Sequence, residues 1–261
     1  MRYSLHRYFF TMLFLLACTA ASADSLQCKR QDCPAFGGHD ALLTLLHQCL
    51  LEREQRGLQC PCTALNTNEG MAKGYALVKD CKGESQFLLI PTATITGIED
   101  PLLQAPGTPN YFAAAWQSRS LVDQALGHVL TPEQVSLALN PQHRRSQNQL
   151  HIHIDCLAGD VGRALAAQAK NIGPDWQSLA VPLKGHAYRA MRILGSTLTV
   201  DPVAVLFADL KQHDGAERAQ QEMGQHSLLV TGATFADAPG FVVLDGVESA
   251  AEELQDHTCG A

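Results

Sequence analysis

The stretch that decides the fold reads Arg144-Arg145-Ser146-Gln147-Asn148-Gln149-Leu150-His151-Ile152-His153-Ile154-Asp155-Cys156. From Gln149 onward, apolar and polar residues alternate strictly, which is the period of a half-buried β-strand. The polar side of this strand carries Gln149, His151, His153 and Asp155, and the apolar side carries Leu150, Ile152, Ile154 and Cys156. Asp is depleted from ordinary strand faces. A face with two imidazoles, an amide and a carboxylate therefore indicates a functional site.

Three interpretations of this polar face are open from the residue types. In the first, the histidines are satisfied structural groups without a chemical role. In the second, His151, His153 and Asp155 bind a metal ion, because imidazole nitrogen and carboxylate oxygen both suit divalent ions. In the third, one imidazole attacks phosphorus while a backbone carbonyl holds its second nitrogen, so that the attacking nitrogen is unprotonated.

The segment from Ser146 to Ile154 resembles the signature strand of the histidine-triad superfamily of nucleotide hydrolases and transferases. That pattern is His-φ-His-φ-His-φ-φ, where φ is apolar, with Ser or Thr five residues before the central His. Here Ser146 stands five residues before His151, and Gln149 occupies the first triad position, which departs from the pattern. A rival register would make His153 the nucleophile. The sequence favours His151, because only this register has a hydroxyl residue five positions upstream.

The longer string Gln-Asn-x-x-His-Ile-His-Ile-x-Cys, which ends at Cys156, is similar to the bacterial CDP-diacylglycerol pyrophosphatases, a membrane-associated branch of that superfamily. The apolar N-terminal segment and the chain length add to this resemblance. It implies a role in phospholipid metabolism, with hydrolysis of CDP-diacylglycerol to CMP and phosphatidate through a nucleotidyl-histidine intermediate. No metal or other cofactor is implied.

The resemblance also implies roles for individual residues. His151 is expected to be the nucleophile, His153 to hydrogen-bond a phosphate or leaving oxygen, and Gln149 to orient the nucleophile. The expected substrate-binding residues are Ser146, Gln147 and Asn140. The strand expected over 135–139 ends just before Asn140, and a hairpin to the histidine strand would point Asn140 toward the histidines.

Charge adds further candidates for substrate binding. The chain has 19 Lys and Arg against 26 Asp and Glu, a formal charge of −7, which does not fit nucleic-acid binding. An anionic substrate therefore needs a local positive patch. Arg144 and Arg145 are candidates, since the arginine fork suits phosphate oxygens. Lys184 and His186, close to an aromatic residue, form a second cluster that could receive a lipid phosphate.

Residues 1–23 are typical of a targeting segment. A basic start precedes an apolar run from Phe9 to Ala17, and Ala21-Ser22-Ala23 is a small-x-small cleavage pattern. The apolar run is shorter than the roughly 20 residues that span a bilayer, which favours an export signal, and Cys18 lies in a segment similar to a lipoprotein acylation box. The family resemblance favours a single inner-membrane anchor, a periplasmic catalytic domain over 24–261 and contact with the membrane lipid surface.

Cysteine usage agrees with export. Of the nine cysteines, eight follow residue 23, at positions 28, 33, 49, 60, 62, 81, 156 and 259. An even number in an oxidising compartment predicts disulfides, although the pairing does not follow from sequence. Cys156, on the apolar face of the histidine strand, is the expected exception, as a packed free thiol.

The fold class predicted for 24–261 is α+β, a histidine-triad-like antiparallel sheet with helices packed on one face and a C-terminal elaboration. The predicted helices are 41–54, 110–130, 160–171 and 203–213. The predicted strands are 74–79, 86–90, 135–139, 227–230 and 241–244, besides the histidine strand. Two alternative functions remain: a metal-dependent phosphohydrolase using His151, His153 and Asp155, and a non-catalytic, disulfide-braced envelope protein that binds a ligand.

Overall fold

The computed structural model describes residues 38–236 and 238–260. The predicted anchor over 1–23 and three of the cysteines, Cys18, Cys28 and Cys33, lie outside the described residues. Within the described ranges, no helix has both the length and the apolar character that a membrane crossing requires.

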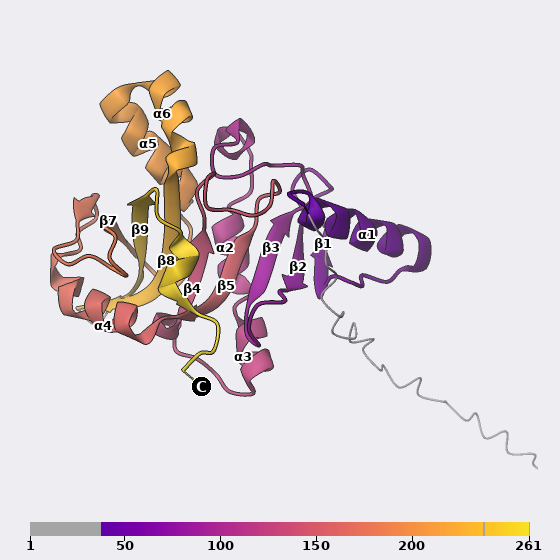
Figure 1. The fold of residues 1–261 in the computed structure, drawn as a ribbon, viewed down its shortest axis with the longest axis horizontal. Helices are drawn as coiled ribbons and strands as arrows, with labels where there is room; N and C mark the ends of the chain where they lie inside the picture. Colours follow the sequence, from indigo (N-terminus) through magenta and orange to yellow (C-terminus); the bar gives the residue numbers. More distant parts are fainter. Residues whose placement is uncertain (1–37, 237, 261) are drawn as a thin grey trace, which may run out of the picture.

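A single antiparallel sheet organises the molecule, with the strand order β1-β2-β3-β5-β4-β8-β9-β7-β6 and a short β10 added to β5 (Figure 1). The strands are β1 (Ala64–Asn66), β2 (Tyr75–Lys79), β3 (Phe87–Pro91), β4 (Val135–Leu139), β5 (Ile152–Leu157), β6 (Gln177–Ser178), β7 (Tyr188–Leu194), β8 (His226–Phe235), β9 (Ala238–Val247) and β10 (Gln255–Asp256). The predicted α+β class with an antiparallel sheet is confirmed.

Helices cover both faces of this sheet. The α-helices are α1 (Ala41–Arg56), α2 (Tyr111–Gln117), α3 (Ser120–Leu126), α4 (Gly159–Gln168), α5 (Pro202–Asp214) and α6 (Ala216–Glu222). One apolar cluster joins α2, α3, α5 and α6 to the apolar side of β5, whereas α1 and α4 pack in separate clusters that contain the opposite side of the sheet. The prediction that helices lie on one face is therefore wrong. The sequence explains why both faces are covered. Strand β3 contains an unbroken apolar run, Phe87-Leu88-Leu89-Ile90, which is typical of a strand buried on both sides.

Local signals explain most of the element boundaries. Helix α1 ends at Gly57, whose φ of 68° is in the left-handed region that favours glycine. The helix predicted over 110–130 is instead two helices, with α2 capped by Asn110 and ending before Ser118. The hydroxyl of Ser118 donates to the carbonyl oxygen of Ala114 at 2.9 Å, a bond that competes with helix continuation.

Strand β5 lies in the middle of the sheet, between β3 and β4, with His153 in register with Leu88 on one side and Ala138 on the other. The predicted alternation is confirmed, since Leu150, Ile152 and Ile154 belong to the apolar cluster. The strand is buried on both faces rather than half-buried: His151 is 6% exposed and His153 is 4% exposed. Helix α1 on one side and the C-terminal segment of η5 (Ala251–Leu254) and β10 on the other account for this burial.

Candidate active site

A cavity of about 230 Å³ lies over the start of β5, between the first turn of α1 and the C-terminal segment. It is lined by Ala41, Leu42, Leu45, Asp80, Lys82, Leu88, Asn140, Arg144, Ser146, Gln147, His151, His153 and Glu252. Six residues of the predicted site are among them. The chain thus brings both histidines together with Asn140, Arg144, Ser146 and Gln147.

The imidazole of His151 is held by its own strand. Its Nδ1 atom lies 2.8 Å from the carbonyl oxygen of Gln149. Because a carbonyl oxygen only accepts hydrogen bonds, this contact places the ring proton on Nδ1 and leaves a lone pair on Nε2. Burial lowers the pKa of His151 more than the nearby carbonyl and carboxylates raise it, so the ring is neutral at neutral pH. Neutral imidazole with a free Nε2 is the form that can act as a nucleophile.

The imidazole of His153 is held differently. The side-chain amide nitrogen of Gln86 approaches its Nδ1 atom, and an amide N–H can only donate, so the ring proton of neutral His153 lies on Nε2. That Nε2 is buried and finds no hydrogen-bond partner among the described residues. Burial, and then the neighbouring ring of His151 at a centroid distance of 4.9 Å, lowers the pKa of His153 to about 3. His153 therefore offers a neutral N–H donor beside His151.

Glu252 is the most connected carboxylate of the cavity, and the sequence analysis missed it. Its backbone N–H donates to Asn140 Oδ1 and its Oε2 accepts from Asn140 Nδ2, both at 3.1 Å. Its Oε1 lies 3.0 Å from the ammonium of Lys82 and 3.6 Å from His153 Nδ1. Burial alone raises the pKa of Glu252, but His153 when it is protonated, together with Lys82 and Asn140, outweighs this effect and lowers the pKa; at neutral pH, where His153 is uncharged, Lys82 and Asn140 stabilise the ionised carboxylate.

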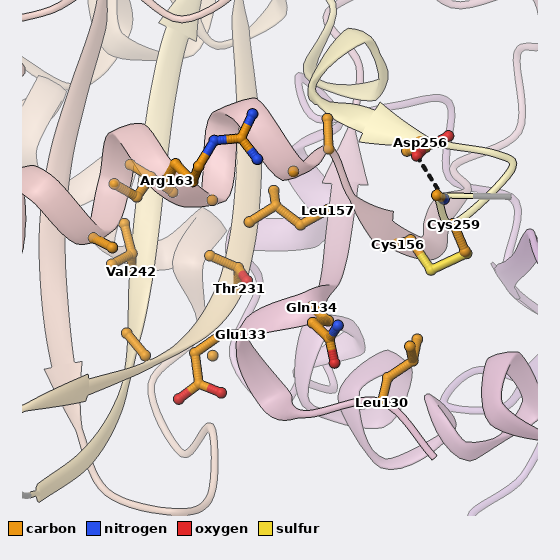
Figure 2. A pocket seen from close by; sticks show the side chains of 18 of the residues that line it. Leu130, Glu133, Gln134, Cys156, Leu157, Arg163, Thr231, Val242, Asp256 and Cys259 are labelled. Carbon is orange, nitrogen blue, oxygen red and sulfur yellow. Dashed lines mark hydrogen bonds between the residues drawn. A yellow bond between two sulfur atoms is a disulfide. The ribbon is translucent and has the colours of Figure 1, made fainter. Parts of the chain in front are cut away.

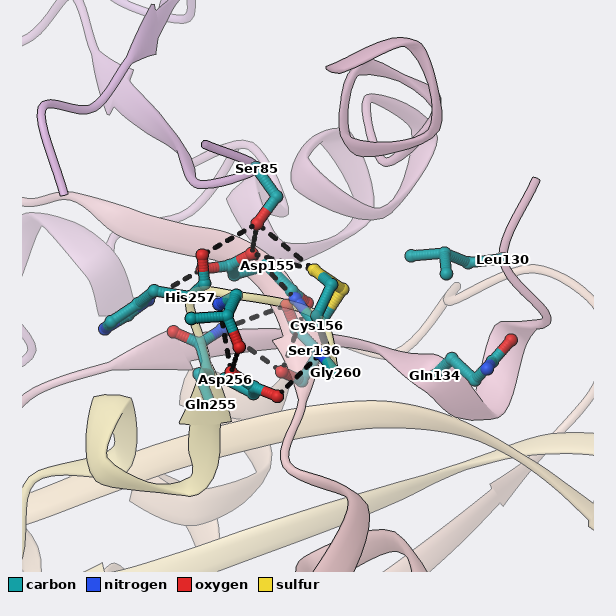
Figure 3. The surroundings of a disulfide bond; sticks show 12 residues. Ser85, Leu130, Gln134, Ser136, Asp155, Cys156, Gln255, Asp256, His257 and Gly260 are labelled. Carbon is teal, nitrogen blue, oxygen red and sulfur yellow. Dashed lines mark hydrogen bonds and ion pairs between the residues drawn. A yellow bond between two sulfur atoms is a disulfide. The ribbon is translucent and has the colours of Figure 1, made fainter. Parts of the chain in front are cut away.

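Asp155, a predicted metal ligand, is already saturated with hydrogen bonds (Figure 3). Its Oδ1 accepts from the Ser85 hydroxyl at 2.6 Å and its Oδ2 accepts from His257 Nδ1 at 2.7 Å. That hydrogen bond, against the effect of burial, raises the pKa of His257. Asp155 does not line the cavity.

The metal-ligand set predicted from the sequence does not converge. Over residues 38–236 and 238–260, the one cluster of three or more His, Cys, Asp or Glu with ligand atoms within 4.8 Å of one another is Asp155, Cys156 and Cys259. The sulfurs of Cys156 and Cys259 are bonded to each other and are not thiolate ligands. His151, His153 and Asp155 do not surround a common point.

All six cysteines of the described ranges are disulfide-bonded, which confirms the prediction for these residues with one correction. Cys49 is bonded to Cys62, and Cys156 to Cys259, while Cys60 and Cys81 are disulfide-bonded as well. The prediction of a free thiol at Cys156 is therefore wrong. Cys156 does lie on the apolar face of β5, but the segment after β10 brings Cys259 back to that face (Figure 2). A residue 103 positions away cannot be paired from sequence spacing.

Two of the predicted residues, Gln149 and Gln147, use their side-chain amides to hydrogen-bond backbone groups around the cavity. The amide of Gln149 donates to the carbonyl oxygens of Pro91 and Ala93, at 3.0 and 2.9 Å, outside the cavity. Gln147 lines the cavity, but its amide accepts from the Leu42 N–H and donates to Gly38. Gln147 therefore ties the first turn of α1 to the histidine strand.

Three predicted cations lie outside the cavity and are paired elsewhere. Arg145 forms a two-pronged ion pair with Glu99, with both N–O distances at 2.7 Å. Lys184 pairs with Asp160 at 2.6 Å, and His186 Nε2 lies 3.6 Å from Glu253. The structure does not bring these three residues to the histidines, whereas exposed Arg144 and Lys82 do line the cavity.

A larger cavity of about 590 Å³ lies at the other end of β5, under α4 (Figure 2). Its lining includes Cys156, Leu157, Arg163, Thr231 and Val242, and none of the predicted catalytic or substrate-binding residues. Its walls are mostly apolar, and the histidines are absent from it. The smaller cavity therefore is the candidate active site.

Comparison with known proteins identifies the family of the chain. A family model described as CDP-diacylglycerol pyrophosphatase matches residues 37–261, which includes every residue of the cavity. The CDP-diacylglycerol pyrophosphatase of Yersinia pestis is 36% identical to this chain over 97% of the chain and 93% of its own length. The chain belongs to the CDP-diacylglycerol pyrophosphatase family of hydrolases.

Proposed function

We propose that this protein hydrolyses CDP-diacylglycerol to CMP and phosphatidate, with His151 as the nucleophile. Family membership supports the substrate. The observation that carries the mechanism is the contact between His151 Nδ1 and the carbonyl oxygen of Gln149, which leaves Nε2 unprotonated at the cavity. His153 lacks such a backbone contact.

In the first half-reaction, Nε2 of His151 attacks the cytidylyl phosphorus. The P–N bond forms, the bond from phosphorus to the phosphatidate oxygen breaks, and its electron pair leaves with phosphatidate. The Nε2–H of His153, which is otherwise unpartnered, donates to a phosphate oxygen and stabilises the charge that develops there. Phosphatidate is a fairly good leaving group, so this step does not depend on strong general-acid help.

The groups around the histidines complete the phosphate site. Ser146 and Asn140 donate hydrogen bonds to phosphate oxygens, and Arg144 and Lys82 supply positive charge in an otherwise acidic protein. Gln149 and Gln147 act as positioning residues, through the chain segments that they hold. Arg145, Lys184 and His186 are left out of this site, because their ion pairs are made elsewhere.

In the second half-reaction, water attacks the nucleotidyl-histidine, CMP leaves and His151 is restored. The enzyme thus divides one displacement at phosphorus into two. Because the proposed substrate is a membrane lipid, the enzyme would bind it at a membrane surface. The sequence of residues 1–23 and the disulfides support a periplasmic domain anchored at the inner membrane.

One assay tests the proposal. Purified protein is incubated with CDP-diacylglycerol in detergent micelles and excess chelator, and CMP is measured. CMP formed with chelator supports the histidine mechanism, whereas CMP formed only after metal is added supports the metal-dependent phosphohydrolase. Failure to form CMP under either condition supports the ligand-binding protein. His151→Gln, which keeps a polar side chain of similar size, is the matched control and is expected to form no CMP above background.

A further inference from the structure

Glu252 places a negative charge in a cavity that must accept an anionic substrate. Its side chain is 14% exposed, lines the cavity and shares it with both histidines. A carboxylate within a few ångströms of a diphosphate weakens ground-state binding, since like charges repel most strongly where water is excluded. A cavity built only to bind the diphosphate would not contain it.

Hydrolysis of the nucleotidyl-histidine needs a base for the attacking water, and neither imidazole can supply it. In the intermediate, Nε2 of His151 is bonded to phosphorus and its Nδ1–H is held by the Gln149 carbonyl. Nδ1 of His153 accepts from Gln86, so its buried Nε2 carries the ring proton and is a donor. The base must come from another cavity residue.

Two carboxylates line the cavity, Glu252 and Asp80. Asp80 accepts the backbone N–H of the next residue, Cys81, at 2.6 Å. Glu252 instead contacts the groups that surround the phosphate site, with its oxygens on Asn140, Lys82 and His153. Glu252 is therefore the carboxylate placed where phosphate and water meet.

We propose that Glu252 is the general base of the second half-reaction, a role that rests on the proposed nucleotidyl-histidine mechanism. Water occupies the position that phosphatidate vacates. Its oxygen forms a bond to phosphorus, its proton passes to a carboxylate oxygen of Glu252, and the P–N bond breaks with its electron pair returning to Nε2 of His151. Glu252 then releases the proton to solvent.

The arrangement around Glu252 suits a base that is needed only after the substrate binds. In the free protein, Lys82 and Asn140 stabilise the ionised carboxylate. A bound nucleotidyl phosphate competes for Lys82 and adds negative charge nearby, and both changes raise the pKa of Glu252 toward the range where a carboxylate is an effective base.

The experiment separates the two half-reactions in the full chain. Wild type and Glu252→Gln are mixed rapidly with CDP-diacylglycerol in detergent micelles, and phosphatidate and CMP are followed separately. For Glu252→Gln we expect a burst of phosphatidate equal to the enzyme concentration, followed by CMP release about 10²-fold slower than in wild type. KM should fall together with kcat, leaving kcat/KM within about threefold, because kcat/KM reports the first half-reaction. Intact mass after denaturation at alkaline pH, which spares the acid-labile P–N bond, should show a cytidylyl adduct.

Matched variants and a rescue exclude a merely structural role. Asp80→Asn removes the other cavity carboxylate, and Glu253→Gln removes the neighbouring one, and neither should accumulate the adduct. Added formate should restore CMP release to Glu252→Ala without changing its phosphatidate burst, since formate supplies the missing carboxylate. The same rescue serves as the test if Glu252→Gln does not fold.

Two different failures are distinguishable. If wild type forms a His151-dependent adduct but Glu252→Gln loses kcat and kcat/KM equally, without extra adduct or formate rescue, Glu252 acts in the first step or in folding and this inference is wrong. If no variant forms an adduct and His151→Gln still releases CMP, the proposed mechanism itself is wrong.

Discussion

The Nδ1 atom of His151 lies 2.8 Å from the carbonyl oxygen of Gln149, two residues earlier in the chain, whereas Nδ1 of His153 accepts from the amide of Gln86. The two imidazoles are two residues apart and face the same cavity, yet these contacts give them opposite tautomers. His151 presents a lone pair and His153 presents an N–H. One ring is therefore suited to attack phosphorus and the other to donate to a phosphate oxygen.

The first prediction concerns this division of roles. His151→Gln should lower kcat by about three orders of magnitude or more, because the nucleophile is lost, while His153→Gln should retain measurable turnover. Glutamine is preferred to alanine because both positions are buried and truncation would leave a cavity. Initial CMP release is measured, with thermal unfolding as the control for folding. A dead His153→Gln beside an active His151→Gln would move the nucleophile by two residues.

The second prediction concerns Gln149. Its amide donates to the carbonyl oxygens of Pro91 and Ala93, and Gln149→Ala leaves the buried acceptor of Pro91 without a donor, at a cost of about 1–3 kcal/mol, and the part-buried acceptor of Ala93 at a smaller cost. Urea unfolding should detect this loss, and kcat should fall because the Gln149 carbonyl that holds His151 shifts. Gln149→His can still donate one bond and should stay within about tenfold of wild-type kcat, roughly 1.4 kcal/mol in the barrier. An unchanged Gln149→Ala would contradict a positioning role.

The sequence predicted this half of the site because it is local. Strict alternation from Gln149 to Cys156 places His151 and His153 on one face, and the short strand ending at Leu139 brings Asn140 to the same cavity. Local backbone geometry is enough to predict both features, because the two-residue period of a strand and the length of a turn determine where side chains point. The same local pattern underestimated burial, because alternation does not reveal what packs on the polar face.

The other half of the site depends on distant pairing, which no local pattern encodes. Glu252 stands in an ordinary acidic stretch, and it reaches Asn140 only because β10 pairs with the end of β5. Similarly, β7 was not predicted, because its first residues, Tyr188 and Arg189, directly follow the cluster that was interpreted as a lipid-phosphate site, although Arg189 is paired with buried Asp245. The position of Glu252 and the strand β7 depend on contacts between residues that are distant in the chain, and sequence spacing does not encode such contacts.

The third prediction concerns the disulfide between Cys156 and Cys259, which fastens the segment carrying His257 to β5 (Figure 3). Glu252 lies five residues before His257 in the same segment. The double variant Cys156→Ser/Cys259→Ser should lose about 2–5 kcal/mol of unfolding free energy, because this bond closes a loop of about a hundred residues. If Glu252 acts in hydrolysis, CMP release should slow more than phosphatidate release. Urea unfolding and the two product assays measure these effects. Equal stability of variant and parent would show that pairing of β10 holds the segment without the bond.

The fourth prediction concerns pH and folding stability. Burial lowers the pKa of His153 to about 3 and also lowers the pKa of His151, whereas in the unfolded chain a histidine titrates near 6.5. Below pH 6.5 the unfolded chain therefore binds more protons than the folded protein, so the free energy of unfolding decreases as pH falls. This contribution is complete above pH 6.5 and is lost progressively down to about pH 3, by at most about 1.4 kcal/mol per pH unit for each histidine.

The window from pH 6.5 to 5 isolates this effect, because carboxylates remain ionised there. His257 acts mainly above this window, because Asp155 raises its pKa: its stabilising contribution is nearly complete below pH 6.5 and is lost as pH rises, so it changes the slope only near pH 6.5. His153→Gln removes one of the two and should flatten the dependence of the unfolding free energy on pH, measured by urea titration at half-unit steps. His128→Gln, at an exposed position, should keep the wild-type slope. An equal slope in wild type and His153→Gln would mean that His153 binds a proton as readily in the folded protein as in the unfolded chain, and that the N–H donor assigned to it is wrong.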